Sequence, residues 1–174
     1  NQFSAPGPFT AGSFAAVQLY GTGSSGAYGV ATGDWNRDGR VDVAVTNFSS
    51  GTVGTLLGNG DGTLGAATTF PVNAGYPRGI VAADLNGDGK LDLATVNGEY
   101  TASLSTLHGN GDGTFAAPAV YSLGDGTSFG HQIVASDLNA DGKLDLVLSY
   151  GGGTVVVAYN QGDGTFHGCV YGLP

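Results

Sequence analysis

Three nine-residue stretches carry most of the acidic side chains of this chain. They read DWNRDGRVD at 34–42, DLNGDGKLD at 84–92 and DLNADGKLD at 137–145, and we call them the acidic loops. Asp recurs at positions 1, 5 and 9, Asn at position 3 and Gly at position 6, and nine of the 14 acidic residues lie here. Clustered oxygen ligands, with no nitrogen or sulfur ligand and with a glycine that permits a sharp turn, are typical of a calcium site.

The pattern predicts one calcium ion in each acidic loop, and therefore three Ca²⁺ per chain. Side-chain oxygens at positions 1, 3, 5 and 9 and the backbone carbonyl at position 7 would coordinate each ion. We expect the charged side chains at position 7 to face water. The predicted metal ligands are Asp34, Asn36, Asp38, Arg40, Asp42, Asp84, Asn86, Asp88, Lys90, Asp92, Asp137, Asn139, Asp141, Lys143 and Asp145.

Other interpretations of the loops fit less well. A solvated acidic turn without metal is the alternative for any single loop, and three loops in register weaken it. An EF-hand is excluded because these loops lack the Glu that an EF-hand has at position 12, and because the flanking residues alternate as strands do. Magnesium prefers to keep several waters in strict octahedral geometry, so it is the poorer candidate.

The acidic loops recur at spacings of 50 and 53 residues, and each is followed by a GDGT segment. These GDGT turns are residues 60–63, 111–114 and 162–165. We interpret their aspartates as turn residues rather than as a second set of metal ligands. Each unit is expected to contain four short antiparallel strands, with the acidic loop between the first two and the GDGT turn between the last two.

Four antiparallel strands per repeat of this length are typical of a β-propeller blade. The sequence therefore predicts an all-β fold and a single domain over 1–174, with three blades plus one extra strand at 12–20. The predicted blades span about 28–71, 78–122 and 131–172. Closed propellers have about four to eight blades. We therefore expect a homo-oligomer that completes a ring, or else a piece of a longer parent.

The amino-acid composition limits the classes of partner that this chain is expected to bind. Lys and Arg together number five in a chain of formal charge −9, so no basic patch favours nucleic acid or anionic membranes. No apolar run approaches the roughly 20 residues of a membrane span, so we expect no membrane insertion. The single cysteine, Cys169, leaves a half-buried free thiol or an interchain disulfide as the alternatives.

The repeats resemble FG-GAP repeats of the bacterial VCBS type, which occur in integrin α-subunit propellers and in many secreted bacterial proteins. Similar calcium-loaded repeats build a seven-bladed fungal lectin. The resemblance covers residues 12–171, and the loop pattern matches in all three units. It implies calcium between the first two strands of each blade, a secreted or extracellular setting, and adhesion or ligand recognition. Three units instead of seven are the departure from the family.

The side of the blades away from the acidic loops receives most of the aromatic residues. Six residues before each loop come Tyr28, Arg78 and His131, a position that varies while its neighbours stay small or apolar. Binding a ligand and lining a central channel are both open for this position. Aromatic faces with few charges suit carbohydrate. The predicted ligand-binding residues are Tyr28, Arg78, His131, Tyr100 and Tyr150.

The leading hypothesis is therefore a non-enzymatic, lectin-like recognition module that binds calcium and a glycan. A propeller that binds another protein, as an adhesion or scaffold segment, is the alternative. A polysaccharide lyase or hydrolase is less favoured. Outside the loops and turns the acidic residues are Glu99 and Asp125, and the paired carboxylates of glycoside hydrolysis are missing from every repeat.

Overall fold

The computed structural model describes residues 17–98, 103–123, 130–151 and 153–171. These residues form twelve β-strands in three four-stranded antiparallel sheets, which confirms the predicted all-β fold. No helix is present in this part of the chain, so none is long and apolar enough to cross a membrane.

Each sheet is a meander in which every strand pairs with the next one along the chain, as in a propeller blade. Blade 1 contains β1 (Ala27–Gly33), β2 (Asp42–Asn47), β3 (Thr52–Leu56) and β4 (Thr68–Pro71). Blade 2 contains β5 (Pro77–Ala83), β6 (Asp92–Asn97), β7 (Ser103–Leu107) and β8 (Ala119–Ser122). Blade 3 contains β9 (Gly130–Ser136), β10 (Asp145–Tyr150), β11 (Thr154–Asn160) and β12 (Phe166–Tyr171).

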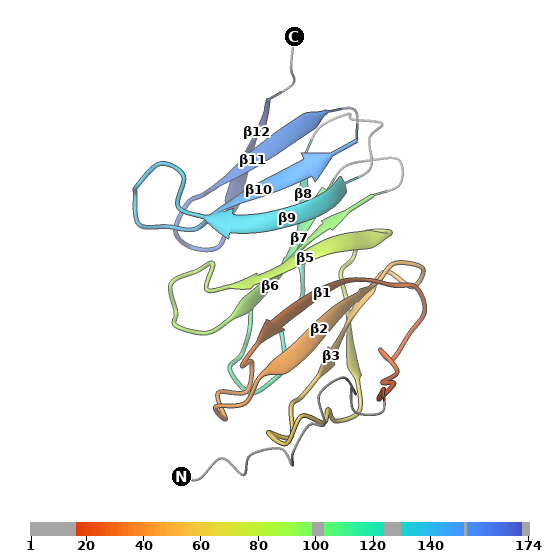
Figure 1. Ribbon diagram of the computed structural model, residues 1–174. Helices are drawn as coiled ribbons and strands as arrows, with labels where there is room; N and C mark the ends of the chain where they lie inside the picture. The colour runs from red at the N-terminus through yellow and green to blue at the C-terminus, as the bar shows by residue number, and fades with distance from the viewer. Residues whose placement is uncertain (1–16, 99–102, 124–129, 152, 172–174) are drawn as a thin grey trace, which may run out of the picture.

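The three blades are stacked face to face (Figure 1). Their first strands lie side by side, β1 next to β5 and β5 next to β9. Gly29 makes this close approach possible, because a Cβ there would lie 2.2 Å from the carbonyl oxygen of Arg78 on the neighbouring blade. The central strand β6 is buried along its whole length, because blades cover both of its faces.

Two hydrophobic clusters hold the stack together, one at each junction between blades. Trp35, Val53 and Phe70 of blade 1 pack with Leu93 and Phe115 of blade 2. The second cluster joins blade 2 to blade 3, and its buried members include Leu85, Leu104, Leu146, Leu148 and Phe166. Each blade therefore buries its apolar side chains against a neighbour rather than within its own sheet.

The extra strand predicted at 12–20 falls largely outside the described residues. Its described part, 17–20, is not in a β-strand. Cys169 lies on β12, and its side chain is also outside the described residues. Trp35 is almost completely buried in the first of the two hydrophobic clusters.

Antiparallel pairing sorts the connections onto two sides of the stack. The acidic loops, which join the first and second strands, and the GDGT turns lie on one side, which we call the loop face (Figure 1, left). The remaining connections, including the β2–β3 loop and the β4–β5 link, lie on the other side, which we call the opposite face.

Candidate functional site

In the first acidic loop, side-chain oxygens gather around one backbone N–H group. The amide of Asp38 donates to Oδ1 of Asp34 at 3.1 Å and to Oδ1 of Asn36 at 3.2 Å. The amide of Gly39 donates to the second carboxylate oxygen of Asp34 at 2.8 Å. Gly39 has φ 81°, a left-handed conformation that glycine adopts without strain. The oxygens at positions 1 and 3 are thus brought close together.

The other two loops repeat this arrangement. The position-5 amide of Asp88 donates to Asp84 at 3.1 Å and to Asn86 at 2.9 Å. In the third loop the Asp141 amide donates to the side chains at positions 1 and 3 at 3.1 and 3.0 Å. The non-glycine residues at position 4, Arg37 and Ala140, have φ 59° and 60°. Left-handed backbone at such residues is uncommon and concentrates at functional loops.

The aspartate at position 9 has a second role that the sequence analysis missed. Asp42 is fully buried, and one of its oxygens accepts the amide of Trp35 at 3.0 Å. The other oxygen accepts the amide of Gly58, which follows β3, at 2.8 Å. The equivalent residues Asp92 and Asp145 make the same pair of bonds. Position 9 therefore fastens the acidic loop to the end of the third strand.

The charged side chains at position 7 lie close to the carboxylate at position 5. Nζ of Lys90 lies 3.1 Å from Oδ2 of Asp88, and the corresponding distances in the first and third loops are 3.8 Å. These side chains were expected to face water, and they do so in part while pairing with their own loop. A hydrogen bond from the Lys90 amide is the main reason that the pKa of Asp88 lies below its usual value.

His108 joins the second loop to the neighbouring blade. Its Nδ1 lies 3.3 Å from Oδ2 of the buried Asp92, and that carboxylate raises the pKa of His108. A Cβ on Gly164 in the GDGT turn of blade 3 would collide with this imidazole ring. No local pattern in the sequence predicts this contact with the next blade.

The oxygen atoms of the acidic loops are suitable ligands for a metal ion, except at position 9. Among the described residues, no group of three or more His, Cys, Asp or Glu side chains is placed to hold a metal ion. A site in these loops therefore has to use the Asn side chain and a backbone carbonyl together with the carboxylates. The all-oxygen set at positions 1, 3, 5 and 7 suits a hard cation such as calcium. Position 9 fits least well, because both its oxygens already accept backbone N–H groups.

The GDGT turns are held by their own side chains. Oδ1 of Asp112 accepts the amide of Thr114 at 2.9 Å and its hydroxyl at 2.6 Å. The same two bonds occur at Asp61 and Asp163. The bond from the threonine hydroxyl is the first cause of the lowered pKa of each of these aspartates. This geometry agrees with a turn residue.

On the opposite face, three of the predicted ligand residues share a local irregularity of the backbone. The pairing of the first strand with the second shifts register at Tyr28, Arg78 and His131, the β-bulge positions of β1, β5 and β9. A bulge adds one unpaired residue and redirects its side chain. Tyr28 and His131 are exposed, and Arg78 is half-buried.

Two of these residues meet across the junction between blades 1 and 2. The guanidinium carbon of Arg78 lies 5.6 Å from the ring centre of Tyr28 and 5.1 Å from that of Phe48. Phe48 in turn packs against Tyr76, with ring centres 5.1 Å apart. We call these four residues the aromatic–arginine cluster. A hollow of about 470 Å³ adjoins it, lined by Phe48, Tyr76, Asn73 and the small residues between them.

Phe48 and Tyr76 were not among the predicted ligand residues, although most aromatic residues were expected on this side of the blades. The signal that could have found them is their position in two connections that meet at one junction. His131 lies on blade 3, and no ring or ion-pair contact joins it to the cluster among the described residues.

The remaining two predicted ligand residues do not reach this surface. Tyr100 lies outside the described residues. Tyr150 belongs to the core between blades 2 and 3 and is buried, and this burial raises the pKa of its hydroxyl. The structure therefore corrects the choice of Tyr150, whose ring fills the junction instead of facing a ligand.

Comparison with known proteins places these features in a family. The model of the FG-GAP-like repeat matches residues 34–95 and 94–148. Cartilage acidic protein 1 of Xenopus tropicalis is 30% identical over 132 residues, which cover 71% of this chain and 20% of that protein. A solved structure of the Photorhabdus luminescens Tc holotoxin pore matches with a TM-score of 0.52 and 22% identity, over 80% of this chain and 7% of that one.

This chain thus spans a small part of both relatives, and the likeness to the holotoxin chain shows the fold alone. The repeat match covers most of blades 1 and 2 and the first part of blade 3, and it includes all three acidic loops. It confirms the resemblance drawn from the loop pattern. The chain belongs to the family of FG-GAP-like repeat proteins.

Proposed function

We propose that this chain is a calcium-stabilised, non-enzymatic recognition module that works outside the cell and binds carbohydrate on its opposite face. The observation that carries the proposal is the aromatic–arginine cluster beside a hollow of about 470 Å³. It joins exposed aromatic rings to one cation, in a part of the chain that is otherwise almost uncharged.

The chemistry of the cluster suits a sugar. Aromatic rings cover the C–H faces of a sugar ring, and the hydroxyl groups of Tyr28 and Tyr76 can exchange hydrogen bonds with sugar hydroxyls. Both tyrosines are exposed, so a ligand can reach them without a change in the core. The guanidinium of Arg78 has five N–H donors, which also suit a sugar carboxylate. The predicted residue His131 is exposed on the same face and is part of the proposal, and Tyr100, which lies outside the described residues, is kept from the sequence prediction.

Calcium is proposed to stabilise the loop face, which is the side of the blades away from the aromatic–arginine cluster. The three loops share one hydrogen-bond pattern, in which the backbone amide of position 5 gathers side-chain oxygens of positions 1 and 3. Each loop also carries carboxylates at positions 1, 5 and 9, and a divalent cation would reduce the repulsion among them. Asp34, Asn36 and Asp38, with the carbonyl of Arg40, would hold the first ion, and the equivalent residues the others. A bound ion supplies charge neutralisation and rigidity here, and no chemistry on a substrate.

The absence of catalysis is part of the proposal. Glu99 and Asp125 are the only acidic residues of the sequence outside the acidic loops and GDGT turns. Glycoside hydrolysis usually needs two carboxylates that flank the scissile bond. The aromatic–arginine cluster contains none. The extracellular setting is supported by the repeat family and by a relative whose name refers to cartilage.

A protein ligand is the second candidate. Tyrosine and arginine are the residues that most often dominate protein interfaces, and Tyr28, Tyr76 and Arg78 lie together. A protein partner would be expected to cover a wider area than the hollow alone.

A glycan array probed in millimolar calcium and again in excess chelator separates these candidates. We expect binding to a small set of sugars, which the variants Tyr28→Ala and Arg78→Gln abolish while Val120→Ala, an exposed change on β8, leaves it intact. An array without signal, from protein shown to be folded and calcium-loaded, would contradict carbohydrate binding and favour a protein ligand.

A further inference from the structure

The second residue of each acidic loop is an apolar side chain that projects toward the next blade. Trp35 of blade 1 is 2% exposed and Leu85 of blade 2 is 1% exposed, because each is covered by the blade that follows it. The equivalent residue of blade 3, Leu138, is 48% exposed. We call this residue the plug of its blade.

Contacts at the two junctions show how a plug is held. The ring of Trp35 lies 6.4 Å from that of Phe115, and its carbonyl accepts the Gly113 amide at 3.1 Å, so blade 2 holds it on both sides. At the next junction the carbonyl of Leu85 accepts the side-chain amide of Asn160 on blade 3 at 2.7 Å. In both cases the plug of one blade enters the next blade along the chain.

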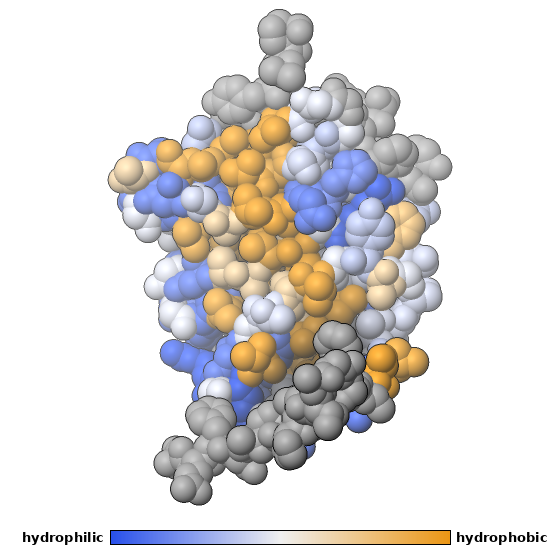
Figure 2. Space-filling view, viewed as in Figure 1, coloured by the Kyte–Doolittle hydropathy of each residue, from blue (hydrophilic) through white to orange (hydrophobic). Residues whose placement is uncertain are grey.

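Other apolar side chains on the plug-bearing face of blade 3, which points away from blade 2, are exposed as well. Val53 of blade 1 and Leu104 of blade 2 are fully buried at their junctions, while the equivalent Val155 is exposed. On the first strands, Val81 is half-buried and its equivalent Val134 is exposed. Figure 2 shows apolar residues gathered in a band across the first strands of the blades.

The face of blade 1 that points away from blade 2 has no blade packed against it among the described residues. Ile80 of blade 2 and Ile133 of blade 3 are buried against the preceding blade, whereas their equivalent Val30 is 65% exposed. Val41 is 66% exposed, whereas its equivalents Leu91 and Leu144 are half-buried.

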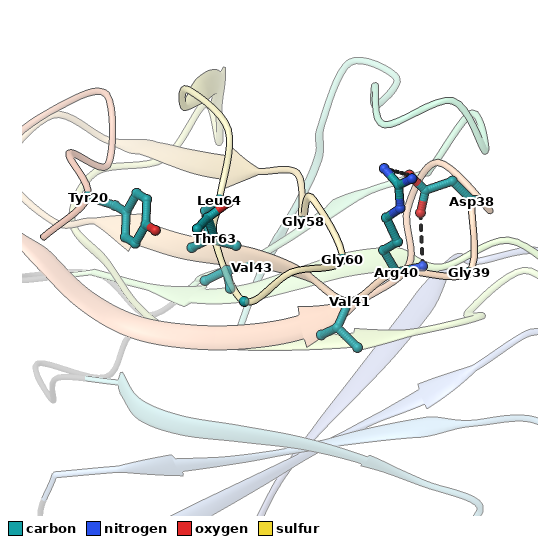
Figure 3. A pocket seen from close by; sticks show the side chains of 11 residues that line it. Tyr20, Asp38, Gly39, Arg40, Val41, Val43, Gly58, Gly60, Thr63 and Leu64 are labelled. Carbon is teal, nitrogen blue, oxygen red and sulfur yellow. Dashed lines mark hydrogen bonds and ion pairs between the residues drawn. The ribbon is translucent and has the colours of Figure 1, made fainter. Parts of the chain in front are cut away.

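A hollow of about 710 Å³ lies at this position on blade 1. Its apolar lining residues are Tyr20, Val41, Val43 and Leu64, and the charged Asp38 and Arg40, Thr63 and several glycines complete the lining. We call this hollow the seat of blade 1 (Figure 3). Leu64 corresponds in the repeat to Phe115 of blade 2, which is buried at the complete junction between blades 1 and 2 and packs there against Phe70 of blade 1, with ring centres 5.2 Å apart.

We infer that blade 3 of one copy of this chain docks on blade 1 of a second copy, with Leu138 inserted into the seat that Val41, Val43 and Leu64 line. The contact continues the arrangement of the two internal junctions, and the residue types on the two bare faces match those at the complete ones. It is heterologous, so each copy offers one plug and one seat. This inference does not depend on the proposed ligand.

Ring closure fixes the number of copies. Closed propellers contain about four to eight blades. Two copies of this 174-residue stretch supply six blades, which is inside that range, and three copies of it would supply nine. The expected assembly is therefore a closed dimer in which both plugs and both seats are used.

Size-exclusion chromatography with light scattering tests this on the full chain. The wild type should have twice the chain mass of 17.3 kDa. Leu138→Asp and Val41→Asp each place a carboxylate in both junctions of the dimer, and each junction should be weakened by about 30-fold or more, the loss of one interface hot spot. Val120→Asp, at a similarly exposed valine of the middle blade, should remain dimeric. Circular dichroism checks that every variant is folded.

Mixing the two defective chains makes the test specific for head-to-tail docking. The Leu138→Asp chain keeps an intact seat and the Val41→Asp chain an intact plug, so the mixture should form a 1:1 heterodimer through one complete junction. Neither chain should dimerise alone. A wild-type monomer at the concentrations used for the variants, or a dimer that both substitutions leave unchanged, would overturn the inference.

Discussion

The loop face and the opposite face of this molecule are built from the same three repeats, yet they follow different rules. On the loop face the three repeats share one set of hydrogen bonds, which includes the two that bind the position-9 aspartate. On the opposite face the equivalent residues are Tyr28, Arg78 and His131, which share a backbone bulge but no chemistry. Repetition thus accompanies structural support, and variation accompanies the surface that is proposed to bind.

The largest effect should come from removing calcium, which acts on all three acidic loops together. At a hundredfold excess over Kd, each bound ion stabilises the folded chain by about 2.7 kcal/mol. For a chain of this size that corresponds to about 5–10 °C in Tm per site. Scanning calorimetry in calcium and in chelator measures the shift. An unchanged Tm would mean that the loops are solvated turns held by their own hydrogen bonds.

A buried position-9 aspartate should matter even without metal. Asp92→Ala leaves the amides of Leu85 and Gly109 without their acceptor, which should cost about 2–4 kcal/mol. The matched change Asp88→Ala, at the exposed position 5, should cost little in chelator and should remove one calcium site. Chemical unfolding of both variants with and without calcium separates the two roles. Equal losses in chelator would contradict the structural role of position 9.

Substitutions on the opposite face should weaken ligand binding while leaving the stability of the fold almost unchanged. Tyr28→Ala removes an exposed ring, so the free energy of unfolding should change by less than about 0.5 kcal/mol. Affinity for a sugar found on the array should fall about tenfold or more, as expected for the loss of one aromatic contact. Titration calorimetry at constant calcium measures the affinity. A variant that binds normally would remove Tyr28 from the site.

The smallest effect is expected at the GDGT turns. The Thr114 hydroxyl and amide hold the pKa of Asp112 below its ordinary value of 3.8. The stabilising contribution of the charged form is therefore present above pH 3.8, and it is lost as the pH falls through the lower pKa of the folded state. Asp112→Asn should lower Tm slightly at neutral pH and not at all in strong acid. Thermal scans at both pH values check this, and a deficit that persists in acid would assign the effect to something other than charge.

Local patterns in the sequence predicted much of the fold. Alternating apolar residues located the strands, and the loop spacing predicted three four-stranded blades. The fourth strands of blades 1 and 2 have four residues each, whereas that of blade 3 has six, and β4 begins only at Thr68. Gly65 is used instead for a backbone hydrogen bond to Leu57, which holds the chain beside the GDGT turn before the strand starts.

The site was less accessible to prediction, because its contacts join residues that are distant in the chain. The pairing of Asp42 with the amide of Gly58 depends on how β3 ends, which no local pattern states. Arg78 reaches Tyr28 only because β1 and β5 lie side by side. Tyr150 occupies the place of Asn47 and Asn97 in the repeat, and its burial follows from packing against blade 2.

Chemical-shift mapping by NMR tests the division between the two faces most directly. Isotope-labelled, calcium-loaded protein would be titrated with a sugar identified on the array. The account predicts shifts at residues 28, 48, 76 and 78, with the acidic loops unchanged. Shifts confined to 34–42, 84–92 and 137–145 would show that the ligand binds at the loop face, and would contradict the assignment of binding to the opposite face.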